Sequence, residues 1–339
     1  MGHEAKPPYR DHRVQRSRRH RYRSGCRPAA QQFGAGPGPA RPRGATPGKP
    51  AGPLLSPFTG EPVNGLGPVL AVKIDNIVVA RPQTGLTKAD IVYLIPVEGG
   101  LSRFLAVFSS HFPPVIGPVR SAREDDLQLP AQFGTPAFAF SGAQPQLLPI
   151  VEHARIVNLY SGAVGGYSRN LNRVAPYNLY ASTSKLLAEA RRASKAHDIG
   201  FRFGPAPAGG QPAASYSVRY PAASVTFRWS AGRSAWLVWL DGAPAASTED
   251  GQLSAPTIVI QYTNVGTSRY LEAGKRPPYA YSVGSGSAVV LRNGRSYSGR
   301  WSRPQAGGGT AFTTATGQQG TFARGQVWVV LAYAPGSTG

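Results

Sequence analysis

Two apolar runs separated by a short glycine turn give the clearest pattern along the chain. The runs span residues 91–97 and 104–108, and the link between them contains Glu98-Gly99-Gly100. Glycines supply the backbone freedom that a tight turn needs, so this pattern predicts a β-hairpin. Pro96 has no N–H for a sheet ladder, which predicts that its strand is an edge strand near its end.

A second alternating segment precedes the hairpin. Every second residue from 70 to 74 is a large apolar one, whereas Lys73 and Asp75 are charged. This predicts a half-buried strand whose outward face becomes polar at its C-terminal end. Open α/β sheets bind ligands at such strand ends, which makes Asp75, Asn76 and Arg81 candidates for a site. Asp75-Asn76 can equally form a turn by bonding its own backbone.

The tetrapeptide Ser121-Ala122-Arg123-Glu124 has the spacing of a helix capping box. Ser121 would accept a hydrogen bond from the amide three residues on while Glu124 reaches back, so we expect a helix to begin there. A helix start offers free N–H groups, and Arg120 and Arg123 add two full positive charges beside it, which predicts an anion site. Alternatively, the acids at positions 124–126 pair with the nearby arginines and serve structure alone.

The rest of the first half alternates strands with helices. Strands are expected at residues 136–140 and 156–160, and helices at 144–154 and 182–195. Beyond a Gly/Pro/Ala-rich linker the pattern changes to short strands, with Asn293-Gly294 as a strong hairpin signal. Six strands are expected in this second half, at residues 224–229, 236–240, 257–262, 287–292, 297–301 and 327–332.

These elements together predict an α+β or mixed α/β protein. An N-terminal α/β domain with a mixed sheet is expected at residues 54–204, followed by the linker at 205–214. A mainly-β domain, either a sandwich or a barrel-like module, is expected at residues 215–335. Residues 1–53 are rich in Gly, Pro and Arg and have too little apolar surface to offset chain entropy, so we expect them to be disordered.

Charge separates this N-terminal segment from the rest of the chain. The protein has 339 residues and a formal net charge of +21, and residues 1–53 hold 12 Lys/Arg against 2 acids. A basic disordered arm can bind nucleic acid or anionic lipid through charge alone. A solvated arm, or an artefact of gene-start assignment, explains the same composition, and we do not expect nucleic-acid binding.

The single cysteine, Cys26, lies in this basic segment, so no intramolecular disulfide is possible. No apolar run reaches the roughly 18 residues that a membrane-spanning helix needs. Ser24-Gly25-Cys26 matches the end of a lipoprotein cleavage site, although Arg23 occupies a position where an aliphatic residue belongs. No apolar signal segment precedes it, so export is not expected from this N-terminus as written. A misassigned start codon would restore a lipid anchor.

Several chemistries have no motif in this chain. There is no Walker-type loop, no dinucleotide-binding glycine fingerprint and no G-x-S-x-G nucleophile elbow. Outside the N-terminal segment the histidines are His111, His153 and His197, whose spacing fits no metal site. We therefore expect no metal and no cofactor.

Six short motifs occur in the first half of the chain, namely LAVKIDN (70–76), RPQTGL (81–86), ADIVY (89–93), VEGG (97–100), RF (103–104) and GPVRSAR (117–123). Together they resemble the YerB-like family of bacterial lipoproteins, whose two halves are domains of unknown function. The resemblance continues into the second half through motifs near residues 284–286, 301–303 and 325–329. It implies an envelope-anchored, extracytoplasmic protein and brings no assigned reaction. Where the family tends to carry Pro-His-Asn, this chain has Pro176-Tyr177-Asn178.

Three hypotheses about function follow. The first is a non-catalytic envelope protein that binds an anionic ligand or a partner protein. Its candidate ligand-binding residues are Asp75, Asn76, Arg81, Glu98, Arg103, Arg120, Ser121 and Arg123. The second is an enzyme acting on a cell-wall polymer, with Glu98 and either Asp75 or Asp126 as acid and base. The third is nucleic-acid binding through the basic segment. We expect binding rather than catalysis, and the oligomeric state stays open.

Overall fold

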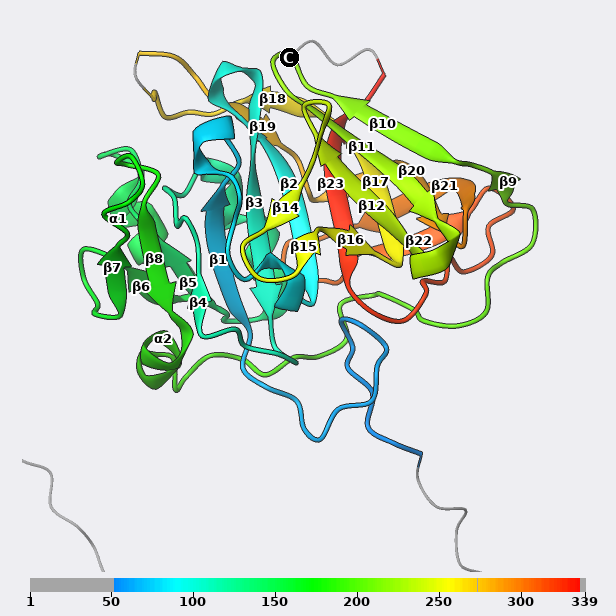
Figure 1. Cartoon of the computed structure of the whole chain (residues 1–339), viewed down its shortest axis with the longest axis horizontal. Coiled ribbons are helices and arrows are strands. Elements are labelled where there is room, and N and C mark those ends of the chain that lie inside the picture. The colour runs from blue at the N-terminus through cyan, green and yellow to red at the C-terminus, as the bar shows by residue number, and fades with distance from the viewer. Residues whose placement is uncertain (1–51, 273, 336–339) are drawn as a thin grey trace, which may run out of the picture. The chain divides into compact units, whose positions relative to one another are not determined.

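A large mixed β-sheet runs through the centre of the protein (Figure 1). The computed structural model describes residues 52–272 and 274–335, so the expected disorder of residues 1–53 falls almost wholly outside the described residues. Ten strands follow one another in the sheet, and β9 (Gln211–Pro212) pairs with β21. Their order is β22 (Ala311–Thr314), β21 (Arg295–Arg303), β20 (Gly284–Arg292), β17 (Thr257–Thr263), β23 (Val327–Tyr333), β2 (Ile91–Val97), β3 (Leu101–Phe108), β1 (Leu70–Asp75), β5 (Ala137–Phe140) and β6 (Val157–Tyr160).

The sheet contains two sets of parallel strands. β23 pairs in parallel with both β2 and β17, and β5 pairs in parallel with both β1 and β6. The other pairings in this sheet are antiparallel. The predicted mixed sheet of the first half is confirmed, and the described chain consists mainly of strands.

Strands from both halves of the chain share this sheet. β2 pairs with β23 from Ile91 opposite Val327 to Leu94 opposite Val330, and the described residues form one compact unit. The division of the chain at residues 205–214 stays a prediction. The structure adds that the segments on either side of it are joined by main-chain hydrogen bonds.

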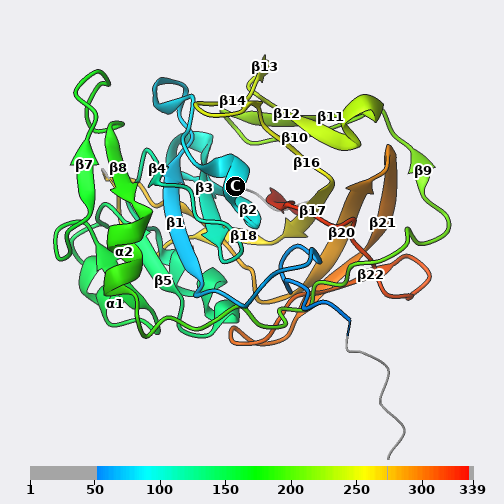
Figure 2. The ribbon, with the colours of Figure 1, turned by 60° about the horizontal axis from the view of Figure 1, so that its bottom comes forward.

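A smaller sheet packs over one face of the large one (Figure 2). Between the two layers, the ring of Trp328 meets Phe104 and Phe227 edge-on, with ring centroids 5.6 and 6.1 Å apart. These side chains belong to one buried apolar cluster, so two layers enclose a shared core. The smaller sheet contains β10 (Ser215–Arg219), β11 (Ser224–Ser230), β12 (Ala235–Leu240), β13 (Ala243–Pro244) and β16 (Ser254–Ala255).

Three further small sheets and several short helices complete the fold. The sheets are β4 (Val115–Ile116), β8 (Leu179–Ser182) and β7 (Tyr167–Arg169); β14 (Ala246–Ser247) and β15 (Gly251–Gln252); and β18 (Val265–Thr267) and β19 (Pro278–Ala280). The α-helices are α1 (Leu148–Glu152) and α2 (Thr183–Glu189). The 3-10 helices are η1 (Val78–Ala80), η2 (Leu86–Lys88), η3 (Glu98–Gly100), η4 (Glu124–Leu127), η5 (Leu129–Phe133) and η6 (Ala231–Arg233). None of the helices in the described ranges has the length and apolar character needed to cross a membrane.

The predicted hairpins are confirmed. β2 and β3 pair from Ile91 opposite Val107 to Val97 opposite Leu101. Asn293 and Gly294 join β20 to β21 with φ values of 52° and 68°, the left-handed backbone of a tight hairpin turn. All six strands expected in the second half are also present, as β11, β12, β17, β20, β21 and β23.

The expected edge position of the strand with Pro96 is wrong, because β2 lies between β3 and β23. The register with β23 ends at Leu94, two residues before the proline. Pro96 therefore lies beyond the part of β2 that pairs with β23, so the sheet tolerates its missing N–H.

The expected half-burial of residues 70–75 is also wrong. β1 lies between β3 and β5, and all six of its residues are buried. Lys73 reaches the carboxylate of Asp126 at 2.8 Å, and both side chains are 0% exposed. Ion pairing, rather than solvent, accommodates the polar positions of this strand.

The predicted helix cap at Ser121 lies two residues before the observed N-cap, Arg123, and the helix that follows is a 3-10 helix of four residues. Ser121 and Ala122 belong to an extended segment, where Ala122 N donates to Gly142 O at 2.8 Å. Helix η4 starts at Glu124, and Arg123 N donates to Asp126 Oδ2 at 2.7 Å. The capping interaction is therefore made by Asp126 rather than by Ser121.

The two longer predicted helices are shorter than expected, since α1 and α2 cover only part of residues 144–154 and 182–195. After α2, Ser194 N donates to Thr135 O and Ala196 N to Gly67 O, each at 2.9 Å. These amides bond neighbouring loops, which ends the helical pattern before Ser194.

Candidate functional site

The segment from Gly117 to Ala122 enters the central sheet between two parallel strands. The register of β1 with β5 covers only Leu70 to Val72. Beyond it, Arg120 N donates to Lys73 O at 2.8 Å, and Ser141 N donates to Arg120 O at 3.0 Å. Arg120 and Ser121 therefore lie at the carboxyl ends of parallel strands, where open α/β sheets bind ligands.

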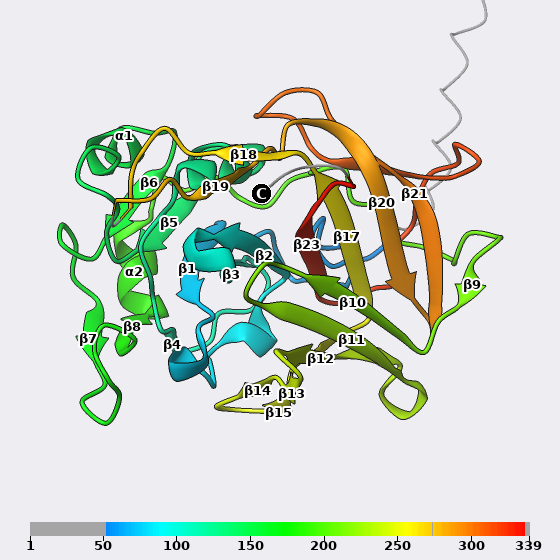
Figure 3. The same cartoon turned by 90° about the horizontal axis from the view of Figure 1, so that it is seen from above.

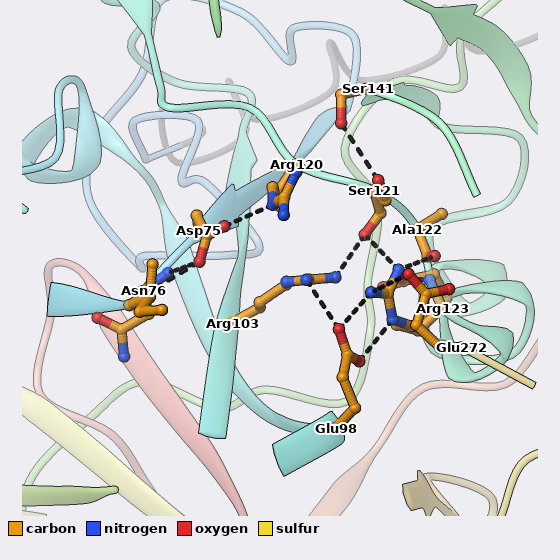
Figure 4. Close-up of polar contacts among 12 residues, drawn as sticks. Asp75, Asn76, Glu98, Arg103, Arg120, Ser121, Ala122, Arg123, Ser141 and Glu272 are labelled. Carbon is orange, nitrogen blue, oxygen red and sulfur yellow. Dashed lines mark hydrogen bonds and ion pairs between the residues drawn. The ribbon is translucent and has the colours of Figure 1, made fainter. Parts of the chain in front are cut away.

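Glu98, in the turn of the β2–β3 hairpin, is held by two arginines (Figure 4). Arg123 Nε donates to Oε2 at 2.8 Å, and Arg123 Nη2 contacts Oε1. Arg103 Nη2 donates to Oε1 at 3.0 Å. Glu272 adds a second carboxylate 3.2 Å from Arg123. We call Glu98, Arg103 and Arg123 the Glu98 clamp, and through it the hairpin turn and the 117–123 segment meet.

The two glycines after Glu98 make this geometry possible. Gly99 and Gly100 both have φ of 71°, a left-handed conformation that side chains disfavour. A Cβ on Gly100 would also lie 2.7 Å from Cβ of Pro221 and 2.8 Å from the backbone nitrogen of Ala222. The tight turn thus presents Glu98 to the arginines while it packs against the second half of the chain.

The charges within the clamp are strongly coupled. Burial raises the pKa of Glu98, but the hydrogen bond and charge of Arg123 and the charge of Arg103 outweigh it and lower the pKa to about 2. Burial, together with the charge of Arg123, lowers the pKa of Arg103 to about 10. All three groups are therefore ionised at neutral pH.

Asp75 and Arg120 form a second ion pair beside the clamp. Arg120 Nε lies 2.6 Å from Asp75 Oδ2, and its guanidinium carbon lies 5.2 Å from the ring centre of Tyr177. The other oxygen of Asp75 accepts from the backbone N–H groups of Asn76 and Ile77 at 2.8 and 3.1 Å. Asp75 thus bonds its own backbone, as the turn interpretation predicts, and also pairs with an arginine.

Four of the candidate residues line one small cavity of about 140 Å³, namely Asp75, Glu98, Arg103 and Arg120. Asn76 and Arg81 lie next to this cavity and bind each other. Arg81 Nη2 donates to Asn76 O and to Asp241 Oδ2, each at 2.7 Å, and so ties the first half of the chain to the smaller sheet. Neither residue lines the small cavity.

A larger pocket of about 480 Å³ lies on the other side of Arg120. Ser141 and Ser161 directly follow the parallel strands β5 and β6, and Ser121 Oγ lies 3.4 Å from Ser141 Oγ. We call this the serine pocket. Its lining is Arg120, Ser121, Ser141, Ser161, Tyr167, Ser168, Arg169, Pro176 and Leu179.

Most of the serine pocket was not predicted from the sequence, since only Arg120 and Ser121 were candidates. A signal for Ser141 and Ser161 was present, because each follows a predicted strand directly. No predicted strand directly precedes Ser168 or Arg169, so the sequence pattern did not indicate them. They reach the pocket from β7, whose place beside β8 depends on the tertiary fold.

The three consecutive acids of η4 have different partners. Glu124 accepts from Arg269 Nε at 2.6 Å and from Ser268 Oγ at 2.8 Å. Asp126 pairs with Lys73, and Asp125 is buried beside them at 2% exposure. The expected pairing of these acids with Arg120 and Arg123 does not form, because those arginines pair with Asp75 and Glu98 instead.

The position of Asp125 predicts a pH dependence of stability. Burial, reinforced by the Asp126 carboxylate and opposed by Lys73, raises its pKa from 3.8 to about 7. The folded protein therefore binds a proton on Asp125 more tightly than the unfolded chain does. The stabilisation from this proton is complete at low pH and is lost as the pH rises through about 7. We expect this group to lower the unfolding free energy by about 1 kcal/mol from pH 6 to pH 8.

Urea unfolding of the wild type and of Asp125→Asn at both pH values measures this effect. The variant should lose less stability than the wild type over that interval. Equal pH dependence of the two proteins would show that Asp125 does not titrate there.

The carboxylates of the enzyme hypothesis are all engaged in ion pairs. Glu98 is bound by two arginines, Asp75 by Arg120 and Asp126 by Lys73. A pKa of about 2 makes Glu98 a poor proton donor at neutral pH. Within the described ranges, no group of three or more His, Cys, Asp or Glu side chains could hold a metal ion.

Comparison with known proteins gives a family and a fold. The family model described as the N-terminal domain of a protein of unknown function (DUF3048) matches residues 58–197, and the model of its C-terminal domain matches residues 216–329. A curated relative, "Putative lipoprotein YerB" of Bacillus subtilis (strain 168), is 51% identical over 75 residues. That match covers 21% of this chain and 22% of the relative, so it spans about a fifth of the relative's length.

The crystal structure of YerB from Bacillus subtilis has a similar fold, with a TM-score of 0.70 and 23% sequence identity. The match covers 82% of this chain and 96% of that one. The arrangement of strands is therefore common to both proteins.

Proposed function

We infer the function of this chain, which belongs to the DUF3048 family, from its own pocket, because the family is one of unknown function. We propose that it is an envelope-associated protein that binds a small anionic group in the serine pocket. The name of the Bacillus subtilis relative, a putative lipoprotein, supports an extracytoplasmic, membrane-anchored location.

The placement of Arg120 is the observation that carries this proposal. Asp75 contacts its Nε, so the two terminal nitrogens are the atoms available to a ligand. Arg169, whose Nη1 binds the neutral amide oxygen of Asn178, brings a second positive charge to the pocket. The pocket lining contains no carboxylate within the described residues, and its four serine hydroxyls can donate hydrogen bonds to anionic oxygens.

The Glu98 clamp has a positioning role in this proposal. Arg103 Nη1 donates to Ser121 O at 3.2 Å, and Arg123 Nη1 donates to Ala122 O at 2.9 Å. Both bonds fix the backbone next to Arg120. Neither Arg103 nor Arg123 lines the serine pocket, so Arg120 and Ser121 are the candidates that would touch the ligand.

Calorimetric titration with inorganic phosphate tests the proposal. We expect saturable binding by the wild type and a loss of affinity of about tenfold or more in Arg120→Gln, because a charge-assisted hydrogen bond contributes roughly 1.5–3 kcal/mol. Arg300→Gln is the matched control, since it removes the same charge from an exposed position on β21. Equal affinity of Arg120→Gln and the wild type would contradict the proposal.

A further inference from the structure

Two neighbouring loops expose large aliphatic side chains to solvent. Val78 and Val79, in η1 after β1, are 65% and 55% exposed, and Leu171 and Val174, in the β7–β8 loop, are 90% and 71% exposed. Figures 2 and 3 show that the loop after β1 and the β7–β8 loop protrude on the same side of the molecule. We call these four side chains the aliphatic tips.

Arg173 binds the two loops to each other. It donates from Nη2 to Arg81 O at 2.7 Å and from Nη1 to Pro82 O at 3.1 Å, and Nη1 also contacts the hydroxyl of Tyr180. Asn178 Nδ2, at the base of the β7–β8 loop, donates to Arg173 O at 3.2 Å. Polar contacts of Arg173 and Asn178 thus hold the two loops, while their four aliphatic side chains stay largely exposed.

The two segments that carry the aliphatic tips are basic, although Arg81 is paired with Asp241 of the smaller sheet. Residues 77–82 and 167–178 contain three arginines and no Asp or Glu. Arg169 and Arg173 donate to neutral oxygens, and within the described residues neither belongs to an ion pair. Protruding aliphatic side chains that are flanked by cations are typical of surfaces that enter the interface of an anionic bilayer.

We propose that this side of the protein docks on an anionic phospholipid bilayer, with Val78, Val79, Leu171 and Val174 inserted among the lipids and Arg173 at the headgroups. The bilayer fits better than a protein partner because the tips are aliphatic and protruding. The centres of protein interfaces are instead rich in aromatic side chains. The inference goes beyond the serine pocket and does not depend on its ligand.

Co-sedimentation of the full chain with vesicles of phosphatidylglycerol mixed into phosphatidylcholine tests this inference. The variant carries Val78→Ser, Val79→Ser, Leu171→Ser and Val174→Ser together. We expect its vesicle affinity to fall by about tenfold or more, since four aliphatic side chains no longer leave water on binding. All four positions are exposed, so the variant should fold as the wild type does.

The control is Ile150→Ser with Leu271→Ser, which removes two aliphatic side chains that are 42% and 47% exposed elsewhere on the molecule. It should bind vesicles as the wild type does. The basic N-terminal segment is present in every protein and raises all affinities alike. Equal binding by the four-site variant and the wild type would overturn the inference, as would an equal loss in the control.

Discussion

Replacing Lys73 with Met is expected to destabilise the protein by about 3–5 kcal/mol, because it leaves a buried carboxylate without its cation. Lys73 Nζ lies 2.8 Å from Asp126 Oδ1, and both side chains are 0% exposed. Asp125 is buried beside them, so its carboxyl group adds to the cost of the unpaired Asp126 carboxylate. Water cannot reach this site to compensate for the loss.

Urea unfolding at neutral pH measures the effect, and the double variant Lys73→Met with Asp126→Asn is its control. Asparagine keeps an oxygen for the backbone N–H of Arg123, which Asp126 accepts at 2.7 Å. Removing both charges should recover a substantial part of the lost stability, since the cost comes from the unpaired charge. If the double variant is less stable than Lys73→Met, the account of this ion pair is wrong.

Glu98→Gln is expected to destabilise the protein by about 3 kcal/mol at neutral pH, because it leaves two buried arginines side by side. Arg103 and Arg123 are 7% and 5% exposed, and both use Glu98 as an ion-pair partner. The pKa of Glu98 in the folded protein, about 2, lies below its ordinary 4.5. The stabilisation should therefore be complete above pH 4.5 and be lost as the pH falls towards 2.

Unfolding measurements of the wild type and Glu98→Gln over this pH range check both the size and the sign. The difference between the two proteins should shrink as the pH falls. Glu189→Gln, at an exposed position of α2, removes the same charge and should change stability by less than about 0.5 kcal/mol. A pH-independent difference would show that the Glu98 charge is not what stabilises the clamp.

The strands and hairpins of the protein could be predicted from sequence because their signals are local. Asn293-Gly294 and Glu98-Gly99-Gly100 specify tight turns through their own backbone preferences, and the apolar runs beside them specify the strands. Burial of Lys73 could not be predicted in this way, since it depends on Asp126 from another element. The pairing of β2 with β23 joins residues more than two hundred positions apart, and no local pattern encodes it.

The candidate site was predicted in part for the same reason. The motifs indicated Glu98, Arg103, Arg120 and Arg123, and the fold brings these four together. The sequence could not show which arginines are neutralised by carboxylates, because that depends on the distance from the hairpin turn to the 117–123 segment. Asn76 and Arg81 also lie in the family motifs. Arg81, however, binds Asn76 and Asp241 and so ties the first half of the chain to the smaller sheet.

The most direct test of the central claim is a crystal structure of the protein soaked in inorganic phosphate. We predict density for the anion in the serine pocket, within hydrogen-bond distance of the Arg120 guanidinium and of the hydroxyl groups of Ser121 and Ser141. Phosphate bound only elsewhere on this basic protein, with the serine pocket free of it, would contradict the claim.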